Sequence, residues 1–331
     1  MGKLYLVTGA AGHLGSTVVR TLCERGERIR ALVLPEEKCL PDAEMEIFRG
    51  DVCDKAGLND FFGNPGGDEL VVIHCAGVVS IATGYNKNVY DVNVTGTKNI
   101  VDMCLENNVS RLVYVSSVHA IPEKPDGECI TEVTEFDPGS VMGQYAKTKT
   151  EATAYVLDAV KRGLNASVVH PSGISGPYDS GRGHLTTLVT DFCRKRLTAA
   201  VNGGYDFVDV RDVAQGIISC CEKGRAGECY ILSNRYLTVR ELLNLLHEIT
   251  GLRAIKTYLP LWFAKLTAPL AEMYYKLRRQ PPLFTPYSLY TLGSNANFSH
   301  AKATAELGYK TTDIRKTLSD TFEWLKKNKR V

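Results

Sequence analysis

The sequence predicts an α/β protein with a doubly wound parallel sheet and a smaller C-terminal lobe. Along the first half of the chain, short β-rich runs alternate with helical patterns. The strand candidates are almost continuously apolar, as expected when helices cover both faces of a parallel sheet. After about residue 172 the alternation becomes irregular. We therefore expect a first domain over residues 1–171 and a second lobe over residues 172–331, from which some strands and helices return to the core.

The elements of the first half can be placed in order. Strands are expected at 3–8, 28–34, 45–50, 70–76, 111–117 and 166–171, and helices near 13–25, 54–62, 86–107 and 142–162. Residues 171–184 are rich in Gly, Ser and Pro and should form a loop. In such sheets ligands bind beyond the carboxyl ends of the strands, so functional residues should follow the strands.

The composition excludes several classes of protein. With 331 residues, 44% hydrophobic and 23% charged, the chain is an ordinary globular sequence. A net charge of +2 gives no field that would attract nucleic acid. The ten cysteines show neither a CxxC pair nor metal-ligand spacing. We expect a reduced, cytoplasmic protein that has no signal peptide, no transmembrane span and no metal.

A glycine-rich turn follows the first strand and opens the first helix. In LVTGAAGHLGSTVV, Gly9, Gly12 and Gly15 are spaced G-x-x-G-x-x-G. Such glycines permit a tight turn and close backbone approach to a pyrophosphate, which the helix N-terminus then attracts. The pattern predicts a dinucleotide site, NAD(H) or NADP(H), with contacts from Gly9, Ala11, Gly12, His13, Leu14 and Gly15.

The second strand leaves the form of the cofactor open. An acid near its end would bind ribose hydroxyls, whereas an arginine would accept a 2′-phosphate. Val33 and Leu34 occupy these positions. Glu36 and Glu37 would disfavour a phosphate, and Lys38 would favour one, so NAD and NADP both remain possible.

A tyrosine and a lysine lie one helical turn apart in GQYAKTKTE. Tyr145 and Lys149 should therefore share a helix face. An ammonium near a phenol favours the phenolate, so Lys149 is expected to lower the pKa of Tyr145. Such a tyrosine could exchange protons with a carbonyl or an alcohol, although an exposed helix face would show the same spacing.

Together these motifs resemble those of the extended short-chain dehydrogenase/reductase superfamily, which includes the NAD-dependent epimerase/dehydratases. TGAAGHLG, GDVCD, IHCAG, NVTGTKN, VYVSS, YAKTK and HPSGISGP are similar to the family's motifs in order and spacing. The C-terminal ANFSHAKATAELGY resembles that of dihydroflavonol-4-reductase-like and 3β-hydroxysteroid-dehydrogenase-like enzymes. The resemblance implies a Rossmann-type fold, a C-terminal substrate-binding lobe and a homodimer formed through helices 86–107 and 142–162.

The resemblance also implies roles for particular residues. Tyr145 would be the acid/base, Lys149 would bind the nicotinamide ribose, Ser117 would hold the substrate oxygen, and Asn93 would be a structural and proton-relay residue. Ser116 is a rival for the serine role. The implied cofactor contacts further include Asp51, Val52, Cys75, Ala76, Gly77, Ser116, Tyr145, Lys149, Pro171, Gly173 and Ile174. Weaker candidates for substrate contact are Val79, His119 and Tyr178.

These residues favour an NAD(P)-dependent oxidoreductase acting on a small, largely apolar ketone, aldehyde or alcohol. A nucleotide-sugar epimerase or dehydratase is the alternative, but Val118 and His119 stand where dehydratases carry an acid. A non-catalytic dinucleotide sensor is disfavoured because the Tyr/Lys pair is present. Residues 259–292 are rich in aromatic and aliphatic side chains that could line an apolar pocket or rest on a membrane surface. His170 replaces the family's usual arginine.

Overall fold

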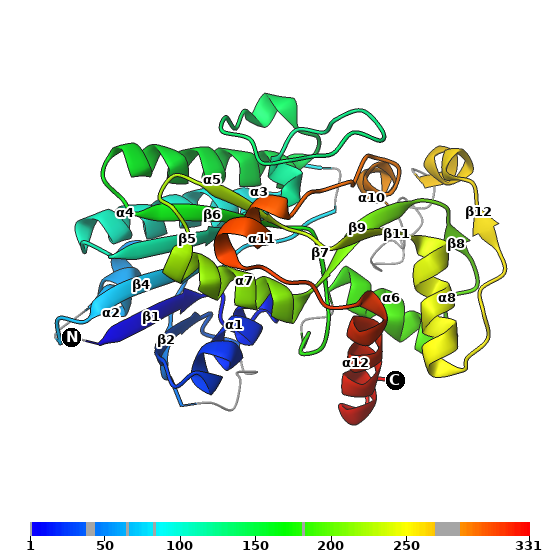
Figure 1. The fold of residues 1–331 in the computed structure, drawn as a ribbon, viewed down its shortest axis with the longest axis horizontal. Helices are drawn as coiled ribbons and strands as arrows, with labels where there is room; N and C mark the ends of the chain where they lie inside the picture. Colours follow the sequence, from blue (N-terminus) through cyan, green and yellow to red (C-terminus); the bar gives the residue numbers. More distant parts are fainter. Residues whose placement is uncertain (1, 38–43, 64–65, 82–83, 181–182, 269–284) are drawn as a thin grey trace.

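A seven-stranded parallel sheet forms the core of the computed structural model, and a lobe built mainly from the second half packs at its carboxyl edge (Figure 1). The structure describes residues 2–37, 44–63, 66–81, 84–180, 183–268 and 285–331. Both the α/β class and the doubly wound parallel sheet predicted from the sequence are confirmed.

The strand order of the large sheet is β10-β6-β5-β4-β1-β2-β3. Its strands are β1 (Lys3–Thr8), β2 (Arg28–Val33), β3 (Glu46–Arg49), β4 (Glu69–His74), β5 (Arg111–Val115), β6 (Ala166–Pro171) and β10 (Cys229–Leu232). The chain reverses its direction of travel across the sheet between β1 and β4, where Thr8 pairs with His74. Doubly wound sheets bind ligands in the crevice at this point.

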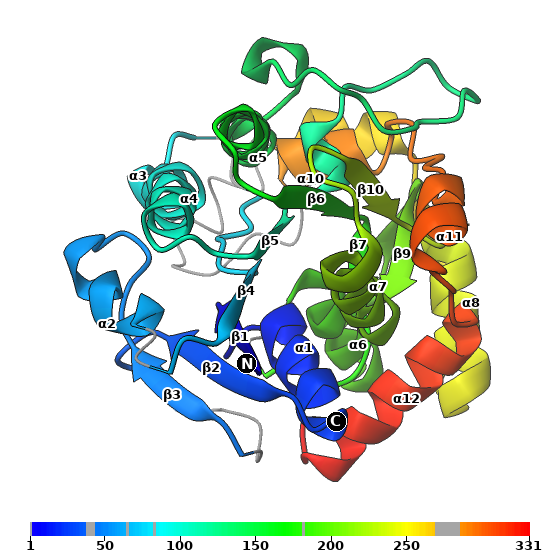
Figure 2. The ribbon, with the colours of Figure 1, turned by 60° about the vertical axis from the view of Figure 1, so that its left-hand side comes forward.

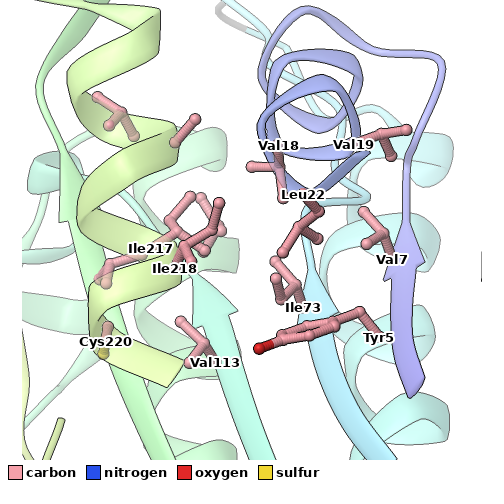
Figure 3. Close-up of a cluster of buried hydrophobic side chains, with 14 of the residues drawn as sticks. Tyr5, Val7, Val18, Val19, Leu22, Ile73, Val113, Ile217, Ile218 and Cys220 are labelled. Carbon is pink, nitrogen blue, oxygen red and sulfur yellow. The ribbon is translucent and has the colours of Figure 1, made fainter. Parts of the chain in front are cut away.

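Helices cover both faces of the sheet (Figure 2). One face carries α1 (His13–Glu24), α7 (Val210–Lys223) and α11 (Ala301–Leu307), and the other carries α2 (Asn59–Phe62), α4 (Thr97–Glu106) and α5 (Gln144–Lys161). On the first face Val18 and Leu22 of α1 and Ile217 of α7 approach each other above Ile73 of β4 (Figure 3). The strands are buried on both faces, which explains their continuous apolar character.

The lobe contains two small sheets and several helices. These elements are β7 (Gly173–Ser175), β8 (Ala200–Val201), β9 (Gly204–Asp209), β11 (Arg235–Thr238), β12 (Tyr258–Leu259), α6 (His184–Cys193), α8 (Val239–Thr250), α10 (Pro286–Thr291) and α12 (Ile314–Lys327). A third hydrophobic cluster, which includes Leu243 of α8 and Leu318 of α12, holds the lobe together. The domain boundary at residue 171 stays a prediction.

Two local expectations differ from the structure. The helix expected over 86–107 is divided into α3 (Lys87–Tyr90), a π-helical turn (Asp91–Gly96) and α4. The segment 171–184, expected to be a loop throughout, contains β7, which pairs with β9. In both places tertiary contacts of the backbone override the local sequence pattern.

A buried carboxylate joins the lobe to the large domain at the start of α7. Asp209 is fully buried, and its side chain accepts a hydrogen bond from the backbone N–H of Arg211. The guanidinium of Arg211 donates to both carboxylate oxygens at 2.9 and 2.6 Å, and Thr317 of α12 donates at 2.8 Å. One side chain therefore caps α7 and anchors α12.

We expect Asp209→Ala to lower the free energy of unfolding by about 3 kcal/mol, because it removes a helix cap and leaves buried donors unpaired. Asp320 is a matched control, since it pairs with the same arginine at 2.7 Å but is partly exposed. Asp320→Ala should cost less than about 1 kcal/mol. Urea denaturation of both variants tests the difference, and equal losses would contradict it.

No helix within the described ranges is long and apolar enough to cross a membrane. The nine cysteines that the structure describes are free thiols. Among the same residues, no cluster of His, Cys, Asp and Glu side chains could hold a metal ion.

Candidate active site

The glycine-rich turn forms a cradle with no room for side chains. A Cβ on Gly9 would lie 2.7 Å from the backbone nitrogen of Ala76, and one on Gly15 would lie 2.1 Å from the Gly9 carbonyl oxygen. Gly9 has a φ of +65°, which favours glycine. No side chain caps the N-terminus of α1 at Gly12, so the helix end is left to a ligand. The turn therefore fits a dinucleotide pyrophosphate.

His13 connects this cradle to the segment after β6. Its Nε2–H donates to the carbonyl oxygen of Pro177 at 2.9 Å, and burial lowers the pKa of the imidazole. On the other side of the cradle, the exposed carboxylate of Asp51 accepts from the N–H of Cys53 at 2.8 Å. Val52 is buried. Asp51 is thus free to face solvent or an adenine, while Val52 packs inside.

Charged groups at the end of β2 are tied to the backbone. Glu37 accepts from the N–H of Leu34 at 2.9 Å, and Nη1 of Arg49 donates to the carbonyl oxygens of Leu34, Pro35 and Glu37. Arg49 was not anticipated from the sequence because it ends the neighbouring strand. Glu37 and Arg49 lie at the end of β2, where such folds distinguish a ribose 2′-hydroxyl from a 2′-phosphate. The site is therefore compatible with either cofactor form.

Tyr145 stands in the first turn of α5 and is 8% exposed. Burial raises the pKa of its hydroxyl to about 12, and a hydrogen bond with Ser117 opposes this rise. The expectation that Lys149 lowers this pKa is therefore not met in the cofactor-free protein. Burial removes water from the phenolate, and that effect dominates.

Lys149 is buried on the same helix and is directed at the end of β5. Its Nζ donates to the carbonyl oxygen of Val115 at 2.8 Å and lies 3.5 Å from the hydroxyl of Tyr114. Burial lowers the pKa of this ammonium to about 8. A buried cation with few partners can gain contacts with a polar ligand such as ribose hydroxyls.

Asn93 lies in the π-helical turn and faces the end of β4. Its amide accepts from the N–H of Val78 at 2.8 Å, and donates to the Val78 carbonyl at 3.0 Å and to the hydroxyl of Thr148 at 3.1 Å. A Cβ on Gly77 would lie 3.3 Å from Asn93 Oδ1 and 3.2 Å from Lys149 Nζ. The structure therefore brings Asn93, Gly77 and Lys149 together.

The two serines after β5 have different partners. The hydroxyl of Ser116 lies 2.7 Å from that of Thr153, inside the protein, whereas Ser117 is the serine that contacts Tyr145. His170 Nδ1–H donates to the Ser117 carbonyl oxygen at 2.9 Å. The histidine that replaces the family's arginine thus holds the backbone of Ser117, and burial lowers its pKa to about 4.

A cavity of about 180 Å³ begins beside Tyr145. His119 forms its wall next to Tyr145, with the two ring centroids 5.9 Å apart. Its Nε2 lies 3.0 Å from the hydroxyl of Tyr205, and its Nδ1 lies 3.4 Å from that of Tyr287. The rest of the lining includes Val118, Ile121, Ile130, Met142, Tyr290 and Phe298. Polar side chains of Glu123, Ser140, Ser294 and Asn295 complete the lining. Burial lowers the pKa of His119 to about 4, so its ring is neutral.

The other predicted residues are spread around this centre. Cys75, Ala76, Pro171, Gly173 and Ile174 lie at or just beyond the ends of strands β4 and β6, on the cradle's edge of the sheet. Val79 is 62% exposed and does not line the cavity. Tyr178 lies away from it, with its ring packed between Arg20 and Trp324. The structure thus groups His119, but neither Val79 nor Tyr178, with the cavity.

The apolar segment 259–292 divides between two environments. Tyr287 and Tyr290 of α10 line the cavity, which fits the pocket expectation. Trp262, Phe263 and Leu266 are exposed at the start of a helix over 261–268. Residues 269–284 lie outside the described part of the chain, so the expectation of a pocket lining or a membrane contact is not followed there.

Comparison with known proteins agrees with the fold. The model of the NAD-dependent epimerase/dehydratase family matches residues 5–233, and the chain belongs to this family. It is 32% identical to sterol demethylase protein B of Methylococcus capsulatus, over 97% of this chain and 98% of that one. It is 29% identical to a putative dihydroflavonol 4-reductase of Synechocystis, over 98% and 95%. The crystal structure of gox2253 covers 99% of both chains with a TM-score of 0.86 and 29% identity.

Proposed function

We propose that this protein is an NAD(P)-dependent oxidoreductase that interconverts a ketone or aldehyde and an alcohol on a small, largely apolar substrate. The observation that carries the proposal is the contact between the buried Tyr145 and Ser117, one helical turn from Lys149 and next to His119 of the cavity wall. Membership of an NAD-dependent family and the fit of the glycine cradle support the cofactor.

Each residue has a role that follows from its position. Bound NAD(P) would supply or accept the hydride. Tyr145 would donate its proton to the substrate oxygen during reduction and take one back during oxidation. Ser117 would hold that oxygen through its hydroxyl, and Lys149 would bind ribose and stabilise negative charge on Tyr145. Asn93 would keep the end of β4 in place beside Lys149.

The aromatic and aliphatic part of the cavity favours a largely apolar substrate. Its described lining places Val118, Ile121 and Phe298 together with tyrosine rings, a surface suited to a flat, polycyclic or aryl carbonyl compound. Two relatives whose names refer to a sterol and to a dihydroflavonol are consistent with this class. A nucleotide sugar would need cationic partners for its phosphates, whereas the charged side chain of the described lining, Glu123, is an acid.

A spectrophotometric screen tests the proposal. Purified protein would be mixed with NADH or NADPH and a panel of ketosteroids, flavonoid ketones and aryl aldehydes, with nucleotide sugars as the counter-panel. We expect oxidation of one cofactor with one class of apolar carbonyl. Interconversion of a nucleotide sugar, with no oxidation in the first panel, would replace this function by an epimerase.

Substitution of Ser117 should separate the contribution of its hydroxyl to turnover from that of its backbone carbonyl, which His170 holds. We expect Ser117→Ala to lower kcat about a hundredfold, because a hydrogen bond to the developing oxyanion is lost. Ser117→Thr keeps a hydroxyl, so its kcat should fall by no more than about tenfold. Steady-state kinetics with the substrate found in the screen measures both, and equal loss in the two variants would contradict the role.

A further inference from the structure

A chain of buried hydrogen bonds centred on His74 crosses the sheet beneath the cofactor cradle. Nδ1 of His74 lies 2.7 Å from the hydroxyl of Thr8, which accepts from the N–H of Ala76 at 3.2 Å. Nε2 of His74 lies 3.1 Å from the hydroxyl of Thr97, and that hydroxyl donates to the carbonyl oxygen of Asn93 at 2.7 Å. Thr8, His74, Thr97 and Asn93 are each at most 1% exposed.

The partners fix the tautomer of the ring. Thr97 gives its only proton to Asn93, so it must accept from His74, and Nε2 carries the hydrogen. Nδ1 then accepts the proton of Thr8, whose oxygen receives the N–H of Ala76. In the opposite tautomer, the Thr8 hydroxyl oxygen would accept from both the ring N–H and the N–H of Ala76. The hydroxyl proton of Thr8 would then lose its acceptor on the ring. The ring is neutral, since burial lowers the pKa of His74 to about 3.

This chain joins three segments that surround the cofactor. Thr8 immediately precedes Gly9, whose backbone packs on Ala76. His74 ends β4, and Asn93, whose carbonyl accepts from Thr97, lies in the π-helical turn. Rotation or loss of the ring would release the cradle on one side and the Asn93 turn on the other.

We propose that His74 is a positioning residue with two separable arms, one that sets the dinucleotide cradle through Thr8 and one that sets, through Thr97, the turn that carries Asn93. The arm through Thr97 rests on the proposed function, because its effect is read in catalysis. The arm through Thr8 acts through dinucleotide binding alone.

Two amide substitutions separate the arms. In His74→Gln the amide nitrogen can replace Nε2 as donor to Thr97, and the acceptor for Thr8 is lost. In His74→Asn the amide oxygen can replace Nδ1 as acceptor, and the donor is lost. We expect His74→Gln to raise the Kd for NAD(P)H roughly fivefold, more than it lowers kcat. His74→Asn should lower kcat roughly fivefold, more than it raises Kd.

Thr8→Val and Thr97→Val are matched variants that remove one hydroxyl each and keep the side-chain shape. Thr8→Val should reproduce the pattern of His74→Gln, and Thr97→Val that of His74→Asn. Adding His74→Asn to Thr97→Val should cause little further loss of kcat, because Thr97→Val already removes both hydrogen bonds of this arm. These variants keep the inference testable if the His74 variants do not fold.

Nicotinamide fluorescence gives Kd, and steady-state kinetics gives kcat. Equal changes of Kd and kcat in all variants, or changes in melting temperature alone, would overturn the inference and leave His74 a structural residue. If the unmodified protein binds NAD(P)H but transfers no hydride, the proposed function fails. The inference then stands only if His74→Gln and Thr8→Val weaken binding more than His74→Asn and Thr97→Val do.

Discussion

Replacement of Tyr145 by phenylalanine is expected to lower kcat about a thousandfold, because it removes the proton donor and leaves the ring in place. The hydroxyl is the part of this side chain that contacts Ser117, while the ring packs beside His119. The variant should therefore fold normally. Its Kd for NAD(P)H should change by less than about twofold, since the cradle at Gly9–Gly15 is untouched.

Kinetics and nicotinamide fluorescence on the same preparation measure both quantities. Tyr155 provides a control on the same helix, because its hydroxyl donates to Asp102 at 2.7 Å and neither residue lines the cavity. Tyr155→Phe should keep kcat within about twofold of the unmodified protein. Normal turnover by Tyr145→Phe would show that another group supplies the proton.

The parallel sheet could be predicted because its strands carry their own signal. Continuous apolar runs alternate with helical patterns through residue 171, and six of the seven strands of the large sheet lie where the sequence places them. The seventh, β10, was not predicted. It has only four residues in the irregular half of the chain, and its place beside β6 is set by tertiary packing.

The residues proposed for the cofactor side could be picked out for the same reason, since Gly9, Tyr145 and Lys149 belong to local motifs. Those of the substrate side could not. Tyr205 and Tyr287 meet His119 across 86 and 168 residues of sequence, and no local spacing marks them. Lone tyrosines become a cavity wall only through the fold of the lobe.

The direction of the Tyr145 pKa shift could not be predicted from the sequence either. Spacing along a helix places Tyr145 and Lys149 on one face, but it does not show how deeply that face is buried or where the ammonium points. The structure directs Lys149 at the carbonyl of Val115 and buries both groups. Burial of the phenol then sets the direction of the pKa shift.

Lys149→Met is expected to make the cofactor-free protein more stable at pH 7 and to lower kcat about a hundredfold or more. The buried ammonium has a pKa of about 8, below its ordinary value of 10.5, so the folded protein at pH 7 holds a charge that burial disfavours. Methionine has a similar length and needs no such solvation. The loss of the hydrogen bond to Val115 offsets part of the gain, and a net increase of about 1–2 kcal/mol is expected.

The sign of the pH dependence follows from the same pKa. Between pH 8 and 10.5 the unfolded chain holds a proton on Lys149 that the folded protein has released. Stability of the unmodified protein must therefore rise with pH in this window, relative to the variant. The advantage of Lys149→Met should be full below pH 8 and should shrink as the pH approaches 10.5.

Urea denaturation at pH 7 and pH 9.5 measures this difference without any substrate. Lys147→Met is the matched control, because Lys147 lies on the exposed side of the same helix. Lys147→Met should leave the stability difference between the two pH values unchanged, and it should change kcat by less than about twofold. A Lys149→Met variant that is less stable at pH 7 would show that the ammonium is held by favourable contacts, rather than kept in the protein interior for its role beside the ribose and Tyr145.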